Sequence, residues 1–159
     1  MEMMKVKDIM KTEVITLKPT DTLNEAVKKF AEKDIHGAPV VDDENKIIGI
    51  LTEKDILSEL KTKTTKLSLI FPSSHALGMT FQESITQQEV REAFKEVGET
   101  KVDEVMKKNV ITTAPDDLIV EIAVKMVNEN VHRLPVVDDG EVVGFITRAD
   151  IIKGLAEVS

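Results

Sequence analysis

Apolar positions along this chain alternate between helical and strand spacing, and the alternation runs through the chain twice. The stretch Leu23–Ala31 has apolar residues at i, i+3, i+4, i+7 and i+8 behind a Thr22-to-Glu25 capping-box pattern, which predicts an amphipathic helix. Two β-branched runs on either side of an acidic turn then predict a hairpin, and a second helical pattern follows. The same series begins again at Ile119. Each half is therefore predicted to form strand, helix, strand, strand and helix.

The repeated patterns are also repeated motifs. His36-x-x-Pro-Val-Val-Asp-Asp is followed by Gly49-x-x-Thr-x-x-Asp55, and His132-x-x-Pro-Val-Val-Asp-Asp is followed by Gly144-x-x-Thr-x-x-Asp150. The chain is therefore an internal duplication. Each Thr-x-x-Asp lies where a strand meets the start of a helix. Unpaired backbone N–H groups and the positive end of the helix dipole favour a small anionic or ribose-bearing ligand there. Shorter twin features precede each hairpin. The first are two short amphipathic segments, called lead-ins here: Lys5–Met10 and Lys101–Met106. The second are the strand-like runs Val14–Leu17 and Val110–Thr113, stopped by Pro19 and Pro115.

A stretch without a twin separates the two halves. The predicted organisation is a first repeat over residues 1–61, a connector over 62–100 and a second repeat over 101–159. Within the connector, Thr86 and Glu89 have capping-box spacing and Gly98 is a stop signal, so a connecting helix is expected. The apolar positions of this helix are Val90, Ala93, Phe94 and Val97.

Composition narrows the class of protein. The chain has 159 residues, 42% of them hydrophobic and 31% charged, which suits a globular protein with one shared core. It has no cysteine, which excludes disulfides, a thiolate nucleophile and a cysteine-based zinc site. The net charge of −8 without a basic run disfavours nucleic acid. No apolar run is long enough to cross a bilayer and the start lacks a signal peptide's apolar segment, so a cytoplasmic protein is expected.

Together these motifs resemble the cystathionine-β-synthase (CBS) domain pair, also called a Bateman module. The resemblance rests on the twin lead-ins, the Val-Ile-Thr runs, the His-x-x-Pro hairpins and the Gly-x-x-Thr-x-x-Asp segments, and it covers the chain except for the connector. It implies an α/β (α+β) fold of tandem β-α-β-β-α repeats, packed about a pseudo-two-fold axis with two clefts between them, and commonly a homodimer. Such modules bind adenine nucleotides or related adenosyl compounds and regulate a partner.

The resemblance also implies a role for individual residues. The Asp of each Thr-x-x-Asp would accept hydrogen bonds from the ribose hydroxyls, with the Thr beside ribose or phosphate, and the His and basic residues nearby would contact phosphate. The ribose- and phosphate-binding residues are then Thr52, Asp55, Thr147, Asp150, Lys54, His36, His132, Arg133 and Arg148. The adenine-pocket residues are Ile15, Thr16, Ala38, Ile111, Thr112 and Leu134.

The two halves differ in charge at matching positions. Gly37 occupies the place of Arg133, and Glu53 occupies the place of Arg148. An Arg guanidinium suits phosphate oxygens, whereas a Glu carboxylate repels them. One cleft is therefore expected to favour a phosphorylated nucleotide more than the other.

The same residues also have structural interpretations. Asp55 and Asp150 stabilise a helix start as first-turn carboxylates, and Thr52 and Thr147 are suitable N-caps. The histidines can belong to the hairpins alone and the arginines to the solvated surface. No second ligand stands at metal spacing, so no metal site is expected. The Ser73-Ser74-His75 run has no nucleophile elbow or partner carboxylate, so no catalytic residue is expected.

The leading prediction is a stand-alone regulatory module, not an enzyme. It binds AMP, ADP, ATP or S-adenosylmethionine without a further cofactor, forms a homodimer and signals to an unknown regulated protein by a conformational change. Neither nucleic acid nor a membrane is an expected partner. The alternative is a ligand-free structural or protein-interaction dimer in which Asp55 and Asp150 act only as helix caps.

Overall fold

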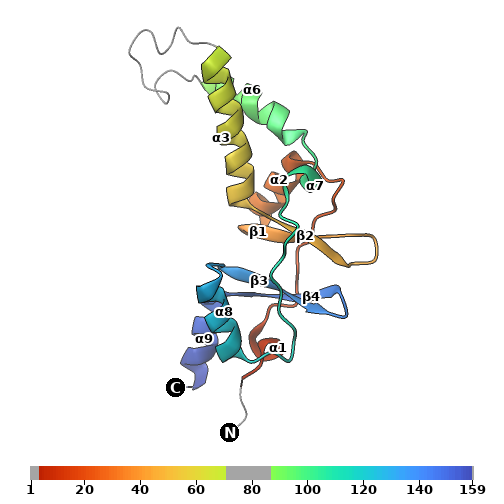
Figure 1. Ribbon diagram of the computed structural model, residues 1–159, viewed down its shortest axis with the longest axis vertical. Coiled ribbons are helices and arrows are strands. Elements are labelled where there is room, and N and C mark those ends of the chain that lie inside the picture. The colour runs from red at the N-terminus through yellow and green to blue at the C-terminus, as the bar shows by residue number, and fades with distance from the viewer. Residues whose placement is uncertain (1–3, 71–86, 159) are drawn as a thin grey trace. The chain divides into compact units, whose positions relative to one another are not determined.

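The structure, a computed structural model, describes residues 4–70 and 87–158 and divides into two compact units (Figure 1). Unit 1 consists of Met1–Thr16, Ala38–Gly49 and Lys108–Ser159, and unit 2 consists of Leu17–Gly37 and Ile50–Lys107. Each unit thus combines segments from both halves of the sequence. The predicted cap Thr86 and the Ser73-Ser74-His75 run lie outside the described residues.

Unit 1 is a hairpin with helices packed on it. Its elements are α1 (Val6–Ile9), α8 (Ile119–Asn128), β3 (Arg133–Asp138), β4 (Glu141–Thr147) and α9 (Arg148–Val158). Strands β3 and β4 are antiparallel, and their turn places Asp139 and Gly140 at positive φ, which glycine adopts without strain. The register pairs Arg133 with Thr147, so the end of β4 lies beside the start of β3.

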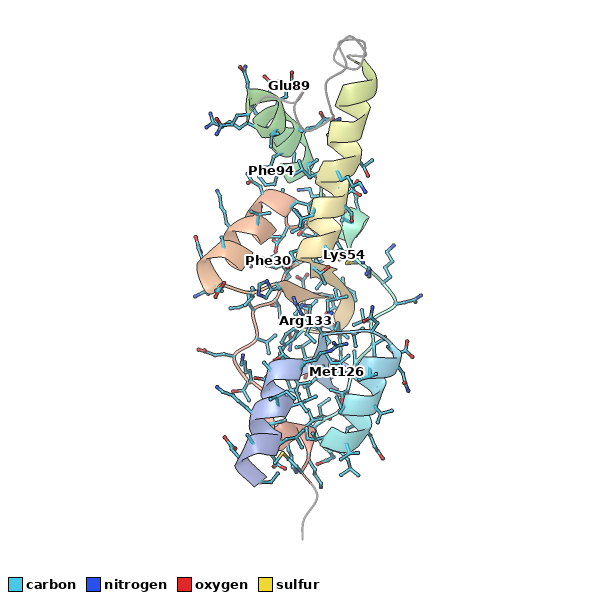
Figure 2. The ribbon with its side chains drawn as sticks, turned by 90° about the vertical axis from the view of Figure 1, so that its left-hand side faces the viewer. Phe30, Lys54, Glu89, Phe94, Met126 and Arg133 are labelled. Carbon is cyan, nitrogen blue, oxygen red and sulfur yellow. The ribbon has the colours of Figure 1, made fainter. Side chains whose placement is uncertain are left out.

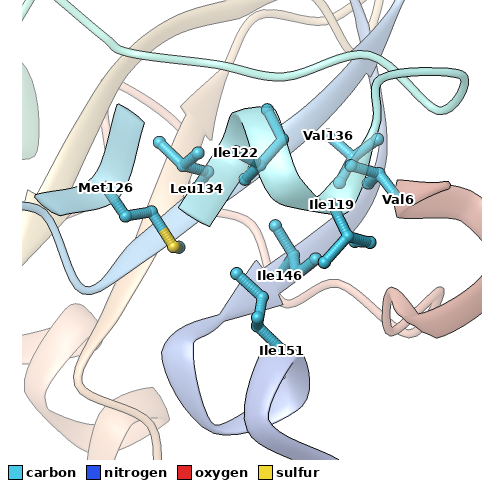
Figure 3. Packing of buried hydrophobic residues seen from close by; sticks show 8 residues of the cluster. All are labelled: Val6, Ile119, Ile122, Met126, Leu134, Val136, Ile146 and Ile151. Carbon is cyan, nitrogen blue, oxygen red and sulfur yellow. The ribbon is translucent and has the colours of Figure 1, made fainter. Parts of the chain in front are cut away.

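The core of unit 1 is an aliphatic cluster from every one of these elements (Figure 3). The predicted stripe of α8 supplies three of its members, and β3 and β4 direct alternate residues at it, as the pleat requires. The cluster consists of Val6, Ile119, Ile122, Met126, Leu134, Val136, Ile146 and Ile151. Val6 is fully buried although it belongs to the N-terminal lead-in.

Unit 2 is helical. Its helices are α2 (Leu23–Lys33), α3 (Glu53–Ile70), α6 (Gln87–Gly98) and α7 (Val102–Val105). The first hairpin, β1 (Gly37–Val41) and β2 (Ile47–Thr52), belongs mostly to unit 1, and the end of β2 leads into α3 of unit 2. Helix α6 packs against both α2 and α3, and its Gly98 lies against the side chain of Asn24 (Figure 1). The connecting helix predicted from the sequence is therefore confirmed, and α3 runs on to Ile70.

The two lead-ins cross between the repeats. In unit 1, the Val6 and Lys7 amides of the first lead-in donate to the carbonyls of Asp117 and Pro115 at 2.9 Å each. In unit 2, the Val102 and Asp103 amides of the second lead-in donate to the carbonyls of Asp21 and Pro19 at 2.8 and 3.1 Å. Each lead-in thus closes the loop before the first helix of the opposite repeat.

The short Val-Ile-Thr runs form less strand than the sequence predicts. The second run makes one parallel bridge, between Thr113 and Val136, in place of a continuous strand. The Thr113 amide donates to the Pro135 carbonyl at 3.1 Å, and the Val137 amide donates to the Thr113 carbonyl at 2.8 Å. Proline at 115 removes the next donor and stops the ladder from extending.

Truncating the crossing lead-in will destabilise the unit that it enters. Val6→Ala deletes two buried methyl groups and should lower the free energy of unfolding by about 2 kcal/mol. Amide exchange should accelerate in β3, β4 and α8, which belong to the other repeat. The control Leu57→Ala, at a position 60% exposed on α3, should change stability by less than about 0.5 kcal/mol. Faster exchange confined to α2 and α3 would contradict the packing described.

Candidate functional site

In unit 1, the predicted ribose carboxylate closes a capping box where β4 ends. The Thr147 amide donates to Asp150 Oδ2 at 3.0 Å, and the Asp150 amide donates to Thr147 Oγ1 at 3.2 Å. Asp150 is only 8% exposed. The reciprocal bonds satisfy two amides at the start of α9 and fix the carboxylate in one orientation.

In unit 2, the twin corner has the same geometry. The Thr52 amide and hydroxyl both donate to Asp55 Oδ2, at 2.9 and 3.0 Å, and the Asp55 amide lies 3.4 Å from Thr52 Oγ1. The capping role that the sequence allowed for these four residues is therefore present in both units. Capping uses Oδ2 of each Asp and leaves Oδ1 without a hydrogen bond from the cap.

The second oxygen of each Asp faces a lysine from the opposite lead-in. Lys11 Nζ lies 3.6 Å from Asp150 Oδ1, and Lys107 Nζ lies 3.9 Å from Asp55 Oδ1. Both distances indicate ion pairs that are too long for a hydrogen bond. Because no buried side-chain oxygen of the described residues lacks a hydrogen-bond partner, these two oxygens must still reach solvent. Each corner therefore holds a fixed carboxylate with accessible acceptor capacity.

Arg148, a predicted phosphate contact, donates hydrogen bonds to two backbone carbonyls of unit 1. Its Nε donates to the Val131 carbonyl at 3.0 Å, and a terminal guanidinium nitrogen donates to the Met126 carbonyl at 3.4 Å. These carbonyls lie at or just past the C-terminal end of α8, where a positive charge complements the helix dipole. In unit 2 the matching residue is Glu53, whose Oε2 lies 3.0 Å from His36 Nδ1.

The other predicted basic residues lie around the same corners. Arg133 is half-buried at the start of β3, directly across from Thr147, and Lys54 is exposed in the first turn of α3 (Figure 2). His132 is exposed just before β3, and its carbonyl accepts from the Arg148 amide at 3.0 Å. Unit 1 therefore gathers His132, Arg133, Thr147 and Asp150 within one hairpin and the helix that follows.

The predicted adenine-pocket residues all belong to unit 1. Leu134 is a member of the aliphatic core, and Ala38 is completely buried on β1. Ile111 packs against that core, and the Thr112 carbonyl accepts from Lys125 Nζ at 2.8 Å. Ile15 and Thr16 are both half-buried. The backbone around Thr112 is thus held on one side by α8 and on the other by β3.

Three contributors to the site were missed from the sequence. Lys11 and Lys107 each follow the terminal Met of a lead-in, a repeated position that could have drawn attention, but their pairing with Asp150 and Asp55 depends on the crossing. Asp117 was assigned only to the start of a helix. Its carboxylate instead accepts from the Ala114 amide at 2.9 Å and the Thr113 hydroxyl at 2.7 Å, and so fixes the turn after Thr112.

Among the residues that the structure describes, no group of three or more His, Cys, Asp or Glu side chains could hold a metal ion. Over the same ranges, no helix combines the length and apolar character that crossing a membrane requires. A hollow between α3 and α6 is lined by residues of the helices and of the turn after α6, and none of these is a predicted site residue: Glu59, Thr62, Lys63, Glu96, Val97 and Thr100.

The family model for the CBS domain matches this chain twice, at residues 6–62 and 102–157. The chain belongs to the CBS domain family. Uncharacterized protein MJ1426 of Methanocaldococcus jannaschii is 36% identical over 97% of this chain and 92% of its own length. Uncharacterized protein MJ1225 of the same organism is 32% identical, and the chain spans 41% of its length.

Solved structures show the same CBS pair architecture. The CBS domain of a membrane protein from Sphaerobacter thermophilus has a TM-score of 0.70 and 32% identity, covering 95% of this chain and 87% of that one. The CBS domain pair of protein MJ0100, in complex with 5′-methylthioadenosine and S-adenosyl-L-methionine, has a TM-score of 0.69 and 27% identity, covering 99% and 100%. The predicted family and α+β fold are therefore confirmed.

The Asp117 carboxylate gives this CBS pair an acid-sensitive turn. The Ala114 amide and then the Thr113 hydroxyl, which both donate to it, hold the pKa of Asp117 below its usual value. Because the pKa is lowered in the folded state, the stabilisation is present above the unfolded pKa of about 4 and is lost as pH falls through the folded pKa.

Asp117→Asn should therefore lower the free energy of unfolding at pH 7 and flatten its acid dependence below about pH 4. Denaturant titrations at several pH values measure both effects. Asp138→Asn, at an exposed position on β3, is the matched control and should reproduce the wild-type pH dependence. An Asp117→Asn curve parallel to the wild-type curve would contradict the role assigned to these hydrogen bonds.

Proposed function

We propose that this CBS pair is a regulatory module that binds an adenosine-containing ligand at its two Thr-x-x-Asp corners. AMP, ADP, ATP and S-adenosylmethionine are the candidates. Asp55 and Asp150 would accept hydrogen bonds from the ribose hydroxyls, with Thr52 and Thr147 beside them. The protein would act by binding and not by catalysis, and the regulated protein would respond to its ligand state.

The observation that carries the proposal is the state of the two carboxylates. Each uses Oδ2 for a capping box, while Oδ1 reaches solvent without a hydrogen bond from the described residues. A carboxylate has about four acceptor positions, so the cap leaves room for two vicinal hydroxyls. Because the cap already fixes the carboxylate, little ordering of Asp55 or Asp150 is needed when a ligand binds.

One comparison and the basic residues near the corners support the ligand class. The CBS pair of MJ0100, 27% identical, is a complex with 5′-methylthioadenosine and S-adenosyl-L-methionine, two adenosine derivatives. Arg133, across the hairpin from Thr147, and His132 beside it would supply positive charge near Asp150 for a phosphorylated ligand. In the other corner, Lys54 and His36 would take that role, with Glu53 opposing it. Ile15, Thr16, Ala38, Ile111, Thr112 and Leu134 would surround the adenine.

The regulatory step would be a shift between arrangements of the chain. A ligand that binds one arrangement more tightly raises its population, and the shift cannot exceed the difference in binding free energy between the arrangements. The crossed lead-ins are suited to transmit such a shift, because each joins the ligand corner of one repeat to the start of the other.

The alternative is an interaction module with unoccupied corners. The completeness of both capping boxes without a ligand favours it, since Asp55 and Asp150 then need no further role. The two functions differ in one property: only the first predicts that adenosine compounds stabilise the fold.

Isothermal titration with AMP, ATP and S-adenosylmethionine separates the two. The wild type should bind at least one of them, and a hundredfold excess over Kd should raise its free energy of unfolding by about 2.7 kcal/mol. Asp150→Asn and Asp55→Asn retain an oxygen for the cap but remove the charge, and should weaken binding about tenfold at their own corner because bonds to a charged acceptor are the stronger ones.

Asp138→Asn is the control with the same change of charge outside the corners. Equal affinity in the two corner variants and this control would contradict the ligand-binding roles assigned to Asp55 and Asp150. The absence of binding by any of the three compounds to the wild type, measured at two temperatures, would establish the interaction module instead.

One face of unit 1 supports the proposal that this protein forms a homodimer. Helices α8 and α9 pack together and leave apolar side chains exposed on both. Exposed charges of both signs, Glu121, Lys153 and Glu157, lie on the same two helices. In a two-fold dimer the same patch of both copies would meet, so that apolar side chains would be buried against apolar side chains. The exposed apolar residues are Val120, Val124, Val127, Ile152, Leu155 and Val158.

The matching face of unit 2 is partly covered within the chain. Helix α6 packs on α2 and α3, with Gly98 against Asn24, the counterpart of Val120, and Lys63, the counterpart of Val158, pairs with Glu96 of α6. Leu57, the counterpart of Ile152, stays 60% exposed. We propose that the homodimer uses the α8–α9 face alone, because the connector helix occupies part of the equivalent surface on the first repeat.

Paired charge insertions test this asymmetry. Ile152→Glu, at a position 66% exposed, should convert the dimer to a monomer in light scattering, because it places a carboxylate in the apolar contact. Its counterpart Leu57→Glu, at a position 60% exposed on α3, should leave the dimer intact. Dissociation by both variants would show that both repeats take part, and a monomeric wild type would remove the proposed interface.

A further inference from the structure

A Lys–Asp pair occurs at each of the two corners, and the backbone of the lysine is held in the same way in both. The Lys11 amide donates to the Phe145 carbonyl and the Phe145 amide donates back to the Lys11 carbonyl, both at 2.9 Å. Lys107 and Ile50 exchange the same two bonds, also at 2.9 Å each. The backbone of each lysine is thus attached to the strand that ends in the Thr-x-x-Asp corner, while its side chain is largely exposed.

The lysines are not required to hold the carboxylates. Oδ2 of each Asp is fixed by the capping box, and the Lys11 and Lys107 side chains are 65% and 61% exposed. Ion pairs with so exposed a partner contribute little to stability and are given up readily. A mobile ammonium group beside a fixed carboxylate therefore has another use: it can leave the carboxylate when hydroxyls arrive and can pair with a different anion nearby.

We propose that Lys11 and Lys107 make these corners selective for anionic adenosine ligands, those with a 5′-phosphate, over neutral or cationic ones. This inference rests on the proposed function. When the ribose hydroxyls bind Oδ1 of Asp150 or Asp55, the displaced ammonium pairs with the phosphate on the same ribose. Adenosine and 5′-methylthioadenosine offer no anion in exchange. S-adenosylmethionine has a sulfonium at the 5′ position, which repels the ammonium, and its single carboxylate lies at the far end of the methionine chain beside an α-ammonium.

The positions of the lysines add a consequence for signalling. Lys11 lies on the first lead-in and Asp150 in the second repeat, and Lys107 with Asp55 is the reverse arrangement. A phosphate held by the lysine and a ribose held by the Asp would therefore connect the two repeats through one ligand. Occupancy by a nucleotide would stabilise the crossed lead-ins, whereas occupancy by an uncharged nucleoside would not.

Titration of the full chain with AMP and with adenosine tests the selectivity. The wild type should bind AMP more tightly than adenosine. In Lys11→Gln/Lys107→Gln, AMP binding should weaken about tenfold or more, the size expected for loss of a charged contact, and adenosine binding should be unchanged or tighter because the carboxylates lose their competitor. Lys11→Arg/Lys107→Arg should restore most of the AMP affinity, and each single Gln variant identifies the corner concerned.

Lys108→Gln is the matched control, since it removes one exposed positive charge next to Lys107 and should leave both affinities unchanged. AMP binding that is unaltered in the double Gln variant, or AMP and adenosine binding that weaken equally, would overturn the selectivity while leaving the proposed function intact. Failure of the wild type to bind AMP, adenosine or S-adenosylmethionine would overturn both.

Discussion

The structure depends on the exchange of lead-ins between the two repeats. Each short helix, α1 or α7, donates backbone hydrogen bonds to the Pro-Asp loop before the first helix of the opposite repeat, and each buries a fully enclosed valine. A repeat of about 60 residues buries a smaller share of its surface than a larger domain and is correspondingly marginal. The exchange supplies the missing wall of each unit, so that neither unit is complete without residues from both halves of the duplication.

The same exchange brings chemistry to the corners where the candidate sites lie. The capping box is a local structure, made by residues three apart, and it would form at any helix that starts with Thr-x-x-Asp. The ammonium group beside each Asp is not local, since it arrives on the lead-in from the other half of the chain. Stability and the proposed ligand recognition therefore involve the same residues: the cap orients the carboxylate, and the crossing places a counter-charge next to it.

Duplication has not kept the two repeats equivalent. Arg148 holds carbonyls at the C-terminal end of α8, whereas its counterpart Glu53 lies beside His36. Helix α6 packs on α2 and α3 and covers part of their outer face, whereas α8 and α9 expose apolar side chains on the corresponding face. The connector thus distinguishes the first repeat from the second.

The sequence by itself determined the features that depend on short-range spacing. The helical stripes, the hairpins, the connecting helix and the Thr-x-x-Asp caps follow from side-chain periodicity and from hydrogen bonds between residues three or four apart. Tertiary structure decided what those spacings leave open. Which lysine meets which Asp, the bonds from Arg148 to Met126 and Val131, the burial of Leu134 in the core and the single bridge at Thr113 depend on residues far apart in the chain. No local rule determines such pairings, because they follow from how the whole core closes around the exchanged lead-ins.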